Sequence, residues 1–137
     1  MKYPYLTVSP PPTRGPFLKR PAVMIEIFGP KRSIKVLGVV DSGADRSLFN
    51  SEIARAVGID LEGAVEGTVT GITGQQRIWS VDEVRIKVEH LDPVMVPVNF
   101  IDSPYVGVLL GQEGFFDSYR IKFEKDHDTF EINPVRK

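Results

Sequence analysis

The sequence predicts a mainly β domain with two short helices. From residue 22 onward, most of the chain consists of short apolar or alternating runs separated by glycine, proline and acidic turns, which is the pattern of strands. Only two short segments carry helix signals. The 137 residues are enough for one domain. The hydrophobic content of 42% is ordinary for a globular protein.

The first 21 residues differ in composition from the rest. They hold six of the eleven prolines, including the run at residues 10–12, and such segments favour extended or polyproline conformations. We expect a proline-rich N-terminal arm over residues 1–21, which Tyr3, Tyr5, Leu6 and Val8 can dock onto the body. The globular domain is expected to span residues 22–137.

The first elements of the domain are a hairpin and a helix. Apolar runs at residues 23–28 and 33–40 flank a Gly-Pro-Lys-Arg turn and predict paired strands. Residues 50–57 follow as a short helix, with Asn50 as the capping residue and Glu52 as an early acid. Gly58 is a suitable C-terminal stop.

The remaining elements are mostly strands. Residues 67–70 and 76–81 flank a glycine-bracketed tip at residues 71–74 and predict a hairpin. Further strands are expected at residues 84–88, 94–101 and 107–111, then a short helix at 112–118 and a terminal hairpin at 119–123 and 129–132. Pro97 indicates a sheet edge or a bulge.

The most informative segment is the acid loop, which we define as residues 41–45, Asp-Ser-Gly-Ala-Asp. A predicted buried strand runs directly into Asp41, and a carboxylate beside a core strand is costly unless it has a partner or a role. Gly43 permits a sharp turn and close backbone approach, and Ser42 supplies a short donor. The segment therefore presents one carboxylate at a structured site.

Three segments together resemble the retropepsin-like aspartic proteases. Residues 41–44 resemble the family's active-site loop. The hairpin tip at residues 71–74, about thirty residues later, resembles its flap. The Val-Leu-Leu-Gly run at 108–111 with the following helix resembles its second apolar-Gly element. The resemblance covers residues 22–123 and implies a retropepsin-like acid protease barrel, acting as an aspartic endopeptidase on a peptide or protein substrate.

The family's chemistry needs two carboxylates that share one proton. Two like charges about 3 Å apart cannot both ionise easily, and aspartic proteases are themselves the standard example of this principle. This chain has one matching loop: Asp102 is followed by Ser-Pro, and Asp117 lies on a predicted helix. The resemblance therefore implies a homodimer whose twofold axis passes between two Asp41 residues.

The resemblance also assigns roles to individual residues. Asp41 is the expected acid and base, Ser42 bonds across the pair of loops, and Gly43 lets the backbone approach the carboxylates. The expected substrate-binding residues, from the acid loop and the flap, are Ala44, Asp45, Gly71, Ile72, Thr73 and Gly74.

Two departures from the family pattern leave an alternative open. Gln112 stands where many retroviral members have an arginine that supports the acid corresponding to Asp45, a role that Arg46 or an arm residue can take. Thr73 stands where a flap glycine is common. The alternative is a catalytically inactive dimerisation or peptide-binding module with the protease fold. A further possibility is that the arm masks the cleft until it is removed.

Other function classes find little support. The net charge of −1 gives no general attraction to nucleic acid or to a membrane. The absence of cysteine excludes disulfides, thiolate metal sites and a cysteine nucleophile. No signal core or membrane-spanning run occurs in the sequence, so a cytoplasmic location is expected.

No metal or other cofactor is expected. Asp41, Asp45 and Glu52 stand at the first, fifth and twelfth positions of a calcium loop, but Gly43 cannot supply the third ligand and Arg46 replaces the needed glycine. His90 and His127 are expected to be solvated turn residues. An ordinary turn is the other interpretation of Asp-Ser-Gly, and the order of the three segments favours the protease.

Overall fold

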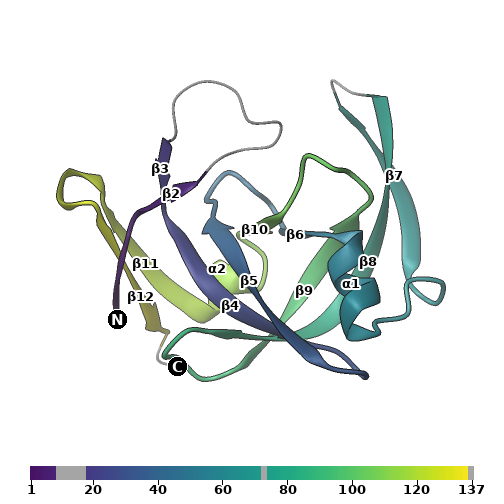
Figure 1. Ribbon diagram of the computed structural model, residues 1–137, viewed down its shortest axis with the longest axis horizontal. Coiled ribbons are helices and arrows are strands. Elements are labelled where there is room, and N and C mark those ends of the chain that lie inside the picture. Colours follow the sequence, from purple (N-terminus) through teal and green to yellow (C-terminus); the bar gives the residue numbers. More distant parts are fainter. Residues whose placement is uncertain (9–17, 72–73, 136–137) are drawn as a thin grey trace.

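A six-stranded barrel forms the body of the molecule in the computed structural model, which describes residues 1–8, 18–71 and 74–135. The strands run in the order β4-β5-β10-β6-β9-β8, and pairing of β8 with β4 closes the barrel (Figure 1). Their bounds are β4 Ala22–Phe28, β5 Ser33–Val40, β6 Ser47–Asn50, β8 Gly74–Val88, β9 Val94–Ile101 and β10 Val108–Leu110. The predicted mainly β barrel with two helices is confirmed.

A long hairpin projects from one end of the barrel. Strand β7, Val65–Gly71, pairs antiparallel with the first half of β8 from Val65↔Ser80 to Gly71↔Gly74. From Ile78 onward β8 also pairs with β9 in the barrel, and its last residues, Arg85 to Val88, pair with β4. The hairpin lies where the flap was predicted, while the tip residues Ile72 and Thr73 lie outside the described residues.

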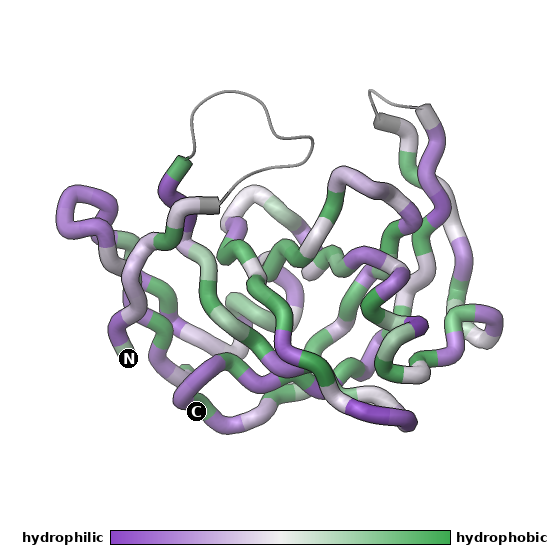
Figure 2. The backbone as a smooth tube through the Cα atoms, in the orientation of Figure 1, coloured by the Kyte–Doolittle hydropathy of each residue, from purple (hydrophilic) through white to green (hydrophobic). Residues whose placement is uncertain are grey.

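A separate three-stranded sheet joins the two ends of the chain. Its order is β1-β12-β11, with β1 at Lys2–Pro4, β11 at Tyr119–Glu124 and β12 at Thr129–Pro134. The predicted terminal hairpin is therefore present, and its turn contains the short 3-10 helix η1, Lys125–His127. Figure 2 shows this turn as a hydrophilic tip.

The described part of the proline-rich segment is in strands. Besides β1, a small hairpin forms from β2, Leu6–Val8, and β3, Leu18–Arg20. Tyr3 is buried and stacks on Phe130, with ring centroids 5.6 Å apart, so the expected docking of this tyrosine is confirmed. Residues 9–17 lie outside the described residues.

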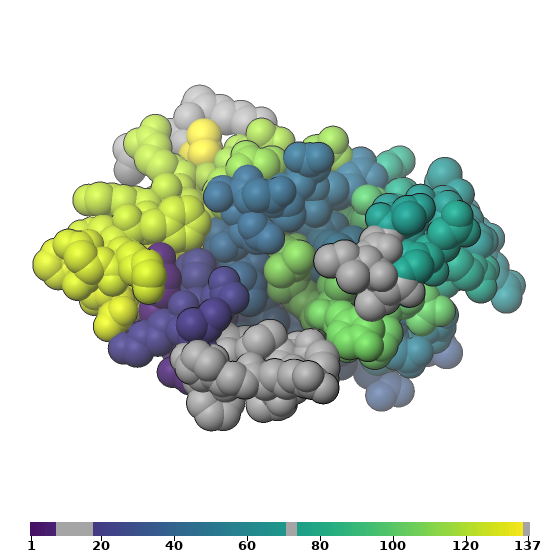
Figure 3. Space-filling model, turned by 90° about the horizontal axis from the view of Figure 1, so that it is seen from above, coloured from purple at the N-terminus to yellow at the C-terminus, as the bar shows by residue number. Residues whose placement is uncertain are grey.

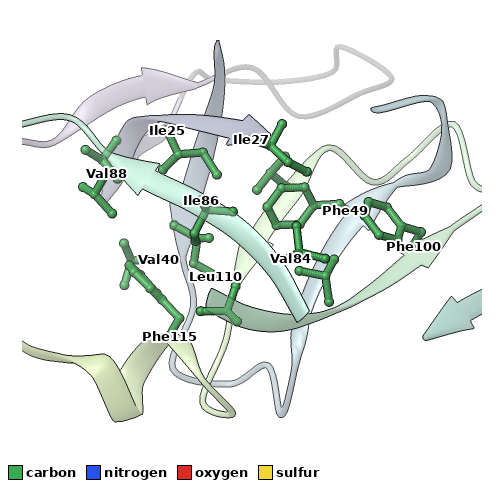
Figure 4. Close-up of a cluster of buried hydrophobic side chains, with 14 of the residues drawn as sticks. Ile25, Ile27, Val40, Phe49, Val84, Ile86, Val88, Phe100, Leu110 and Phe115 are labelled. Carbon is green, nitrogen blue, oxygen red and sulfur yellow. The ribbon is translucent and has the colours of Figure 1, made fainter. Parts of the chain in front are cut away.

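The barrel encloses one apolar core. In β4 the burial alternates, so that Ile25 and Ile27 point inward while Met24 is exposed, as expected for a strand with one buried face. Phe49 and Phe100 pack edge to face across β6 and β9 (Figure 4). Each such buried side chain contributes about 1.5–3 kcal/mol of apolar transfer free energy, which makes the barrel a rigid frame for its loops.

The two helices differ in how well the sequence predicts them. Helix α1, Ser51–Val57, begins after the N-cap Asn50 and ends at Gly58, whose φ of 87° gives the left-handed cap, as predicted. Helix α2 is only Phe115–Ser118, so the predicted start at residue 112 is wrong. The backbone N–H groups of Gln112 and Glu113 instead bond to acid-loop carbonyls. No helix in the described part of the chain is long and apolar enough to cross a membrane.

Pro97 lies at an irregularity rather than at a sheet edge. Strand β9 is interior, between β6 and β8. The register of β8 against β9 shifts between Val81 and Val84, whose partners are Val98 and Val96. Pro97 therefore stands opposite the bulge, where its missing N–H removes no ladder bond. The prediction of an edge or a bulge at Pro97 is therefore met by the bulge.

Candidate active site

The acid loop is a tight turn at the end of β5. The Asp41 N–H donates to the Leu110 carbonyl at 2.9 Å, which continues the parallel pairing of β5 with β10. The Gly43 N–H donates to Asp41 Oδ1 at 2.9 Å, and the Ala44 N–H to the Asp41 carbonyl at 3.2 Å. The carboxylate is thus fixed by its own turn. A Cβ on Gly43 would lie 3.2 Å from Asp41 Oδ1.

The segment after β10 packs directly on the acid loop. The N–H groups of Gln112 and Glu113 donate to the carbonyls of Ala44 and Asp45, each at 2.8 Å. A Cβ on Gly111 would meet the Ala44 carbonyl oxygen at 2.8 Å, so the close approach of the two loops requires glycine here. The apolar-Gly element lies beside the acid loop, as the resemblance implies.

Ser47 is a supporting residue that sequence reasoning missed. Its side chain is fully buried at the start of β6, and its Oγ accepts the Gly111 N–H at 3.0 Å. This bond satisfies a backbone donor at the contact between the two loops, where an unpaired donor is costly. The only signal in the sequence is a small hydroxyl residue at an inward position of a strand.

Within the described residues, neither Gln112 nor Arg46 bonds to the Asp45 side chain. Gln112 Nε2 donates to the Ser42 carbonyl at 2.8 Å, so this residue supports the acid loop at Ser42. Arg46 Nε bonds to Glu113 Oε2 at 2.6 Å, so the expectation that Arg46 pairs with Asp45 is wrong. Within the described residues, the Asp45 carboxylate has no ion pair.

An open cavity of about 880 Å³ lies in front of Asp41. Four segments form its walls: Arg20 and Pro21; Leu37, Val39, Val40, Asp41 and Ser42; Pro104 to Leu109; and Phe123. Figure 3 looks onto this face, where the blue segment between β5 and β6 lies between the purple β3 and the teal β7–β8 hairpin. The volume is that of an ordinary ligand site.

The cavity walls are mainly apolar and partly open to solvent. Leu37, Tyr105 and Phe123 are 37%, 51% and 41% exposed, although each is a large side chain that gains by burial. Together with the Asp41 carboxylate they form an apolar surface around one acid. Exposed apolar surface of this kind marks a binding face.

Comparison with known protein families now decides the identity of the chain. A family model described as aspartyl protease matches residues 23–113, more than half of the chain. The chain belongs to the retropepsin-like aspartyl protease family. No curated protein sequence matches the chain.

The matched range contains the three segments that carry the resemblance: the acid loop, the β7–β8 hairpin and the apolar-Gly element. Strands β1, β2, β3, β11 and β12 lie outside the matched residues.

The predicted site residues fall into two groups. Asp41 and Ser42 line the cavity, and Gly43, Ala44 and Asp45 continue the same loop. Gly71 and Gly74 are paired at the end of the β7–β8 hairpin, away from the residues that line the cavity, while Ile72 and Thr73 lie outside the described residues.

The other acids of the described chain do not repeat the acid loop. Asp102 follows the interior strand β9 and Asp117 lies in α2. Among the described residues there is no group of three or more histidine or acidic side chains that could hold a metal, so Asp41, Asp45 and Glu52 do not form a calcium site. Within the described residues, the chain therefore has one acid loop.

Proposed function

We propose that the chain is an aspartic endopeptidase that works as a homodimer, in which the two Asp41 carboxylates, one from each copy, activate a water molecule. The observation that supports this is a single family acid loop on the wall of an open apolar cavity. One carboxylate cannot serve as acid and base at once. A second copy supplies the other by a twofold axis that passes near Asp41.

In this mechanism the pair shares one proton. The ionised Asp41 takes a proton from water while the protonated Asp41 donates to the oxygen of the scissile carbonyl. The water oxygen bonds to the carbonyl carbon and gives a tetrahedral intermediate. As the intermediate collapses, the C–N bond breaks, the protonated carboxyl gives its proton to the leaving nitrogen, and the ionised carboxylate takes a proton from a hydroxyl of the intermediate. The pair again shares one proton, and no covalent enzyme intermediate forms.

The surrounding loop orients this chemistry. The Gly43 N–H donates to Oδ1 and so holds the Asp41 carboxylate in its orientation. The Ser42 hydroxyl is proposed to bond to the acid loop of the other subunit. The Ser42 carbonyl accepts a hydrogen bond from Gln112 Nε2 within the same subunit.

Substrate recognition is assigned to the loop and the flap. Ala44 and Asp45 are proposed to bond to the backbone of an extended peptide, as a strand does to its neighbour. The flap residues Gly71, Ile72, Thr73 and Gly74 are proposed to close over it and exclude water. The apolar walls of the cavity favour apolar side chains on either side of the cleaved bond.

The test compares wild type with Asp41→Asn on denatured casein across about pH 4 to 7, the range in which a proton-sharing acid pair is active. We expect cleavage by the wild type alone, with both proteins equally folded by circular dichroism. Equal cleavage by both proteins would identify a contaminant, and a monomer at assay concentration in sedimentation would exclude the shared site.

The inactive binding module is the second candidate. Among the described residues no cation pairs with Asp45, and Gln112 donates to the Ser42 carbonyl instead. This candidate predicts that neither protein cleaves casein while both bind casein peptides with the same affinity. Casein cleavage by wild type and by Asp41→Asn therefore distinguishes the two candidates.

A further inference from the structure

Asn50 occupies a position that joins three parts of the molecule. It is the last residue of β6 and the N-cap of α1, with extended φ and ψ of −59° and 136°. Its Oδ1 accepts the Glu52 N–H at 2.9 Å. This bond is the ordinary task of an asparagine at a helix start, and it uses only the acceptor half of the side chain.

The donor half of the same amide holds the loop between β9 and β10. Asn50 Nδ2 donates to the Ser103 carbonyl at 2.7 Å and to the Val106 carbonyl at 2.9 Å. An amide nitrogen has two N–H donors, so both are in use. The backbone N–H of Asn50 adds a third bond, to the Gly107 carbonyl at 2.8 Å.

The loop has weaker bonds of its own. Its internal bonds are the Val106 N–H to the Ser103 carbonyl at 3.4 Å and the Tyr105 N–H to Ser103 Oγ at 3.3 Å. Both are longer than the bonds from Asn50 and lie at the long end of hydrogen-bond geometry. Asn50 therefore determines where the loop lies more than the loop's own contacts do.

This loop is one wall of the cavity in front of Asp41. Pro104, Tyr105, Val106 and Gly107 all line the cavity, whereas Asn50 does not. Asn50 also takes no part in the bonds that hold the acid loop, which come from the loop itself and from residues 110–113. A change at Asn50 therefore moves the wall and leaves the acid in place.

We propose that Asn50 is a positioning residue for substrate recognition, which fixes the Ser103–Gly107 wall opposite Asp41 and so sets which side chains the cleft accepts. This proposal rests on the proposed function, because it treats the cavity as the substrate cleft. A shift of the wall changes the affinity for substrate, while the chemistry at Asp41 stays the same.

The chain offers a matched pair of variants that separates the two tasks of Asn50. Asn50→Asp keeps the oxygen that caps α1 and removes both donors to the wall. Asn50→Ala removes the cap as well. Aspartate caps helices about as well as asparagine does, so a defect shared by both variants belongs to the wall.

The experiment measures kcat, KM and the cleavage sites on denatured casein for wild type and both variants. Loss of two hydrogen bonds is expected to raise KM about tenfold in Asn50→Asp, to leave kcat within about twofold of wild type, and to change the preferred cleavage sites. A fall in kcat with unchanged KM and unchanged sites would overturn the proposal.

Hydrogen exchange gives a second measurement that does not depend on activity. In Asn50→Asp, the amides of residues 103–107 are expected to exchange faster, while those of α1 exchange as in wild type. Unchanged exchange in the loop would overturn the proposal. If the wild type cleaves nothing, the proposed function fails, and the exchange result alone then supports or overturns the role of Asn50 in holding the wall.

Discussion

At the scale of single residues, Gly111 shows how closely the two halves of the site approach. A Cβ at this position would lie 2.7 Å from the Arg46 carbonyl carbon and 2.8 Å from the Ala44 oxygen. Both atoms are backbone and cannot rotate away, unlike the end of a flexible side chain. The contact therefore excludes every other residue type unless the acid loop moves.

We expect Gly111→Ala to destabilise the fold by about 1–3 kcal/mol, because added volume at a tight contact forces the backbone apart. Casein cleavage should also be lost at temperatures where the variant is still folded, since the displaced segment carries Asp41. The matched control is Gly63→Ala, at a residue outside the cavity lining, where the nearest atom to a Cβ would be Asp60 Oδ2 at 3.4 Å. Urea unfolding and casein cleavage measure both quantities, and equal stability of the two variants would contradict the steric argument.

The residues of the site were predictable to different degrees. Asp41, Ser42 and Gly43 are consecutive, so a short pattern identifies them. Ser47 and the donor half of Asn50 act on residues 111 and 103–106, and no local pattern shows which distant carbonyl or N–H a polar side chain reaches. Gln112 was noticed as a departure, but its contact with the Ser42 carbonyl depends on how two loops pack.

At the scale of elements, the terminal sheet carries two buried tyrosines. Burial is the main cause that raises the pKa of both Tyr3 and Tyr119 to about 12, with smaller contributions from Glu89 near Tyr3 and Asp92 near Tyr119. The Tyr3 hydroxyl donates to the Glu89 carbonyl at 2.5 Å. The folded state therefore favours the neutral form of each tyrosine over the ionised form.

This arrangement predicts loss of stability in alkali. Unfolded tyrosine ionises near pH 10, while these two keep their protons up to about pH 12, so the unfolded state binds fewer protons in that window. Stability is complete below about pH 10 and falls as the pH rises towards 12. Thermal melting should show this fall, and Tyr3→Phe should make it less steep. An equally steep fall in Tyr3→Phe would contradict the assignment.

The elements themselves were mostly predictable, because alternation and turn residues mark strands wherever one face is buried. One boundary was wrong. The second helix begins later than residue 112 because Gln112 and Glu113 use their N–H groups on the acid loop, so tertiary pairing overrides the local preference. For Pro97 the sequence allowed an edge or a bulge, and only the register shift between Val81 and Val84 decides between them.

At the scale of the whole molecule, the shared site predicts that chains are not independent catalysts. When wild type is mixed with an equal amount of Asp41→Asn and the subunits exchange, about half of the wild-type chains pair with an inactive partner. We expect the wild-type activity to fall to about half. The matched control is an equal amount of Asp82→Asn, an exposed acid on β8, which should add activity instead. Full activity in the Asp41→Asn mixture would indicate a complete site within one chain.

The pairing of β1 with β12 also affects how the protein is made. Tyr3 in β1 lies opposite Phe130 in β12. Strand β1 is therefore synthesised before the barrel, whereas its partner β12 is synthesised after it. The barrel strands β4 to β10 can pair while synthesis continues, because their partners lie between these two strands. Strand β1 pairs with β12 in this sheet, so the pairing cannot form until β12 is made. The terminal sheet is therefore the last part to form, and its long sequence separation makes it a slow step of folding.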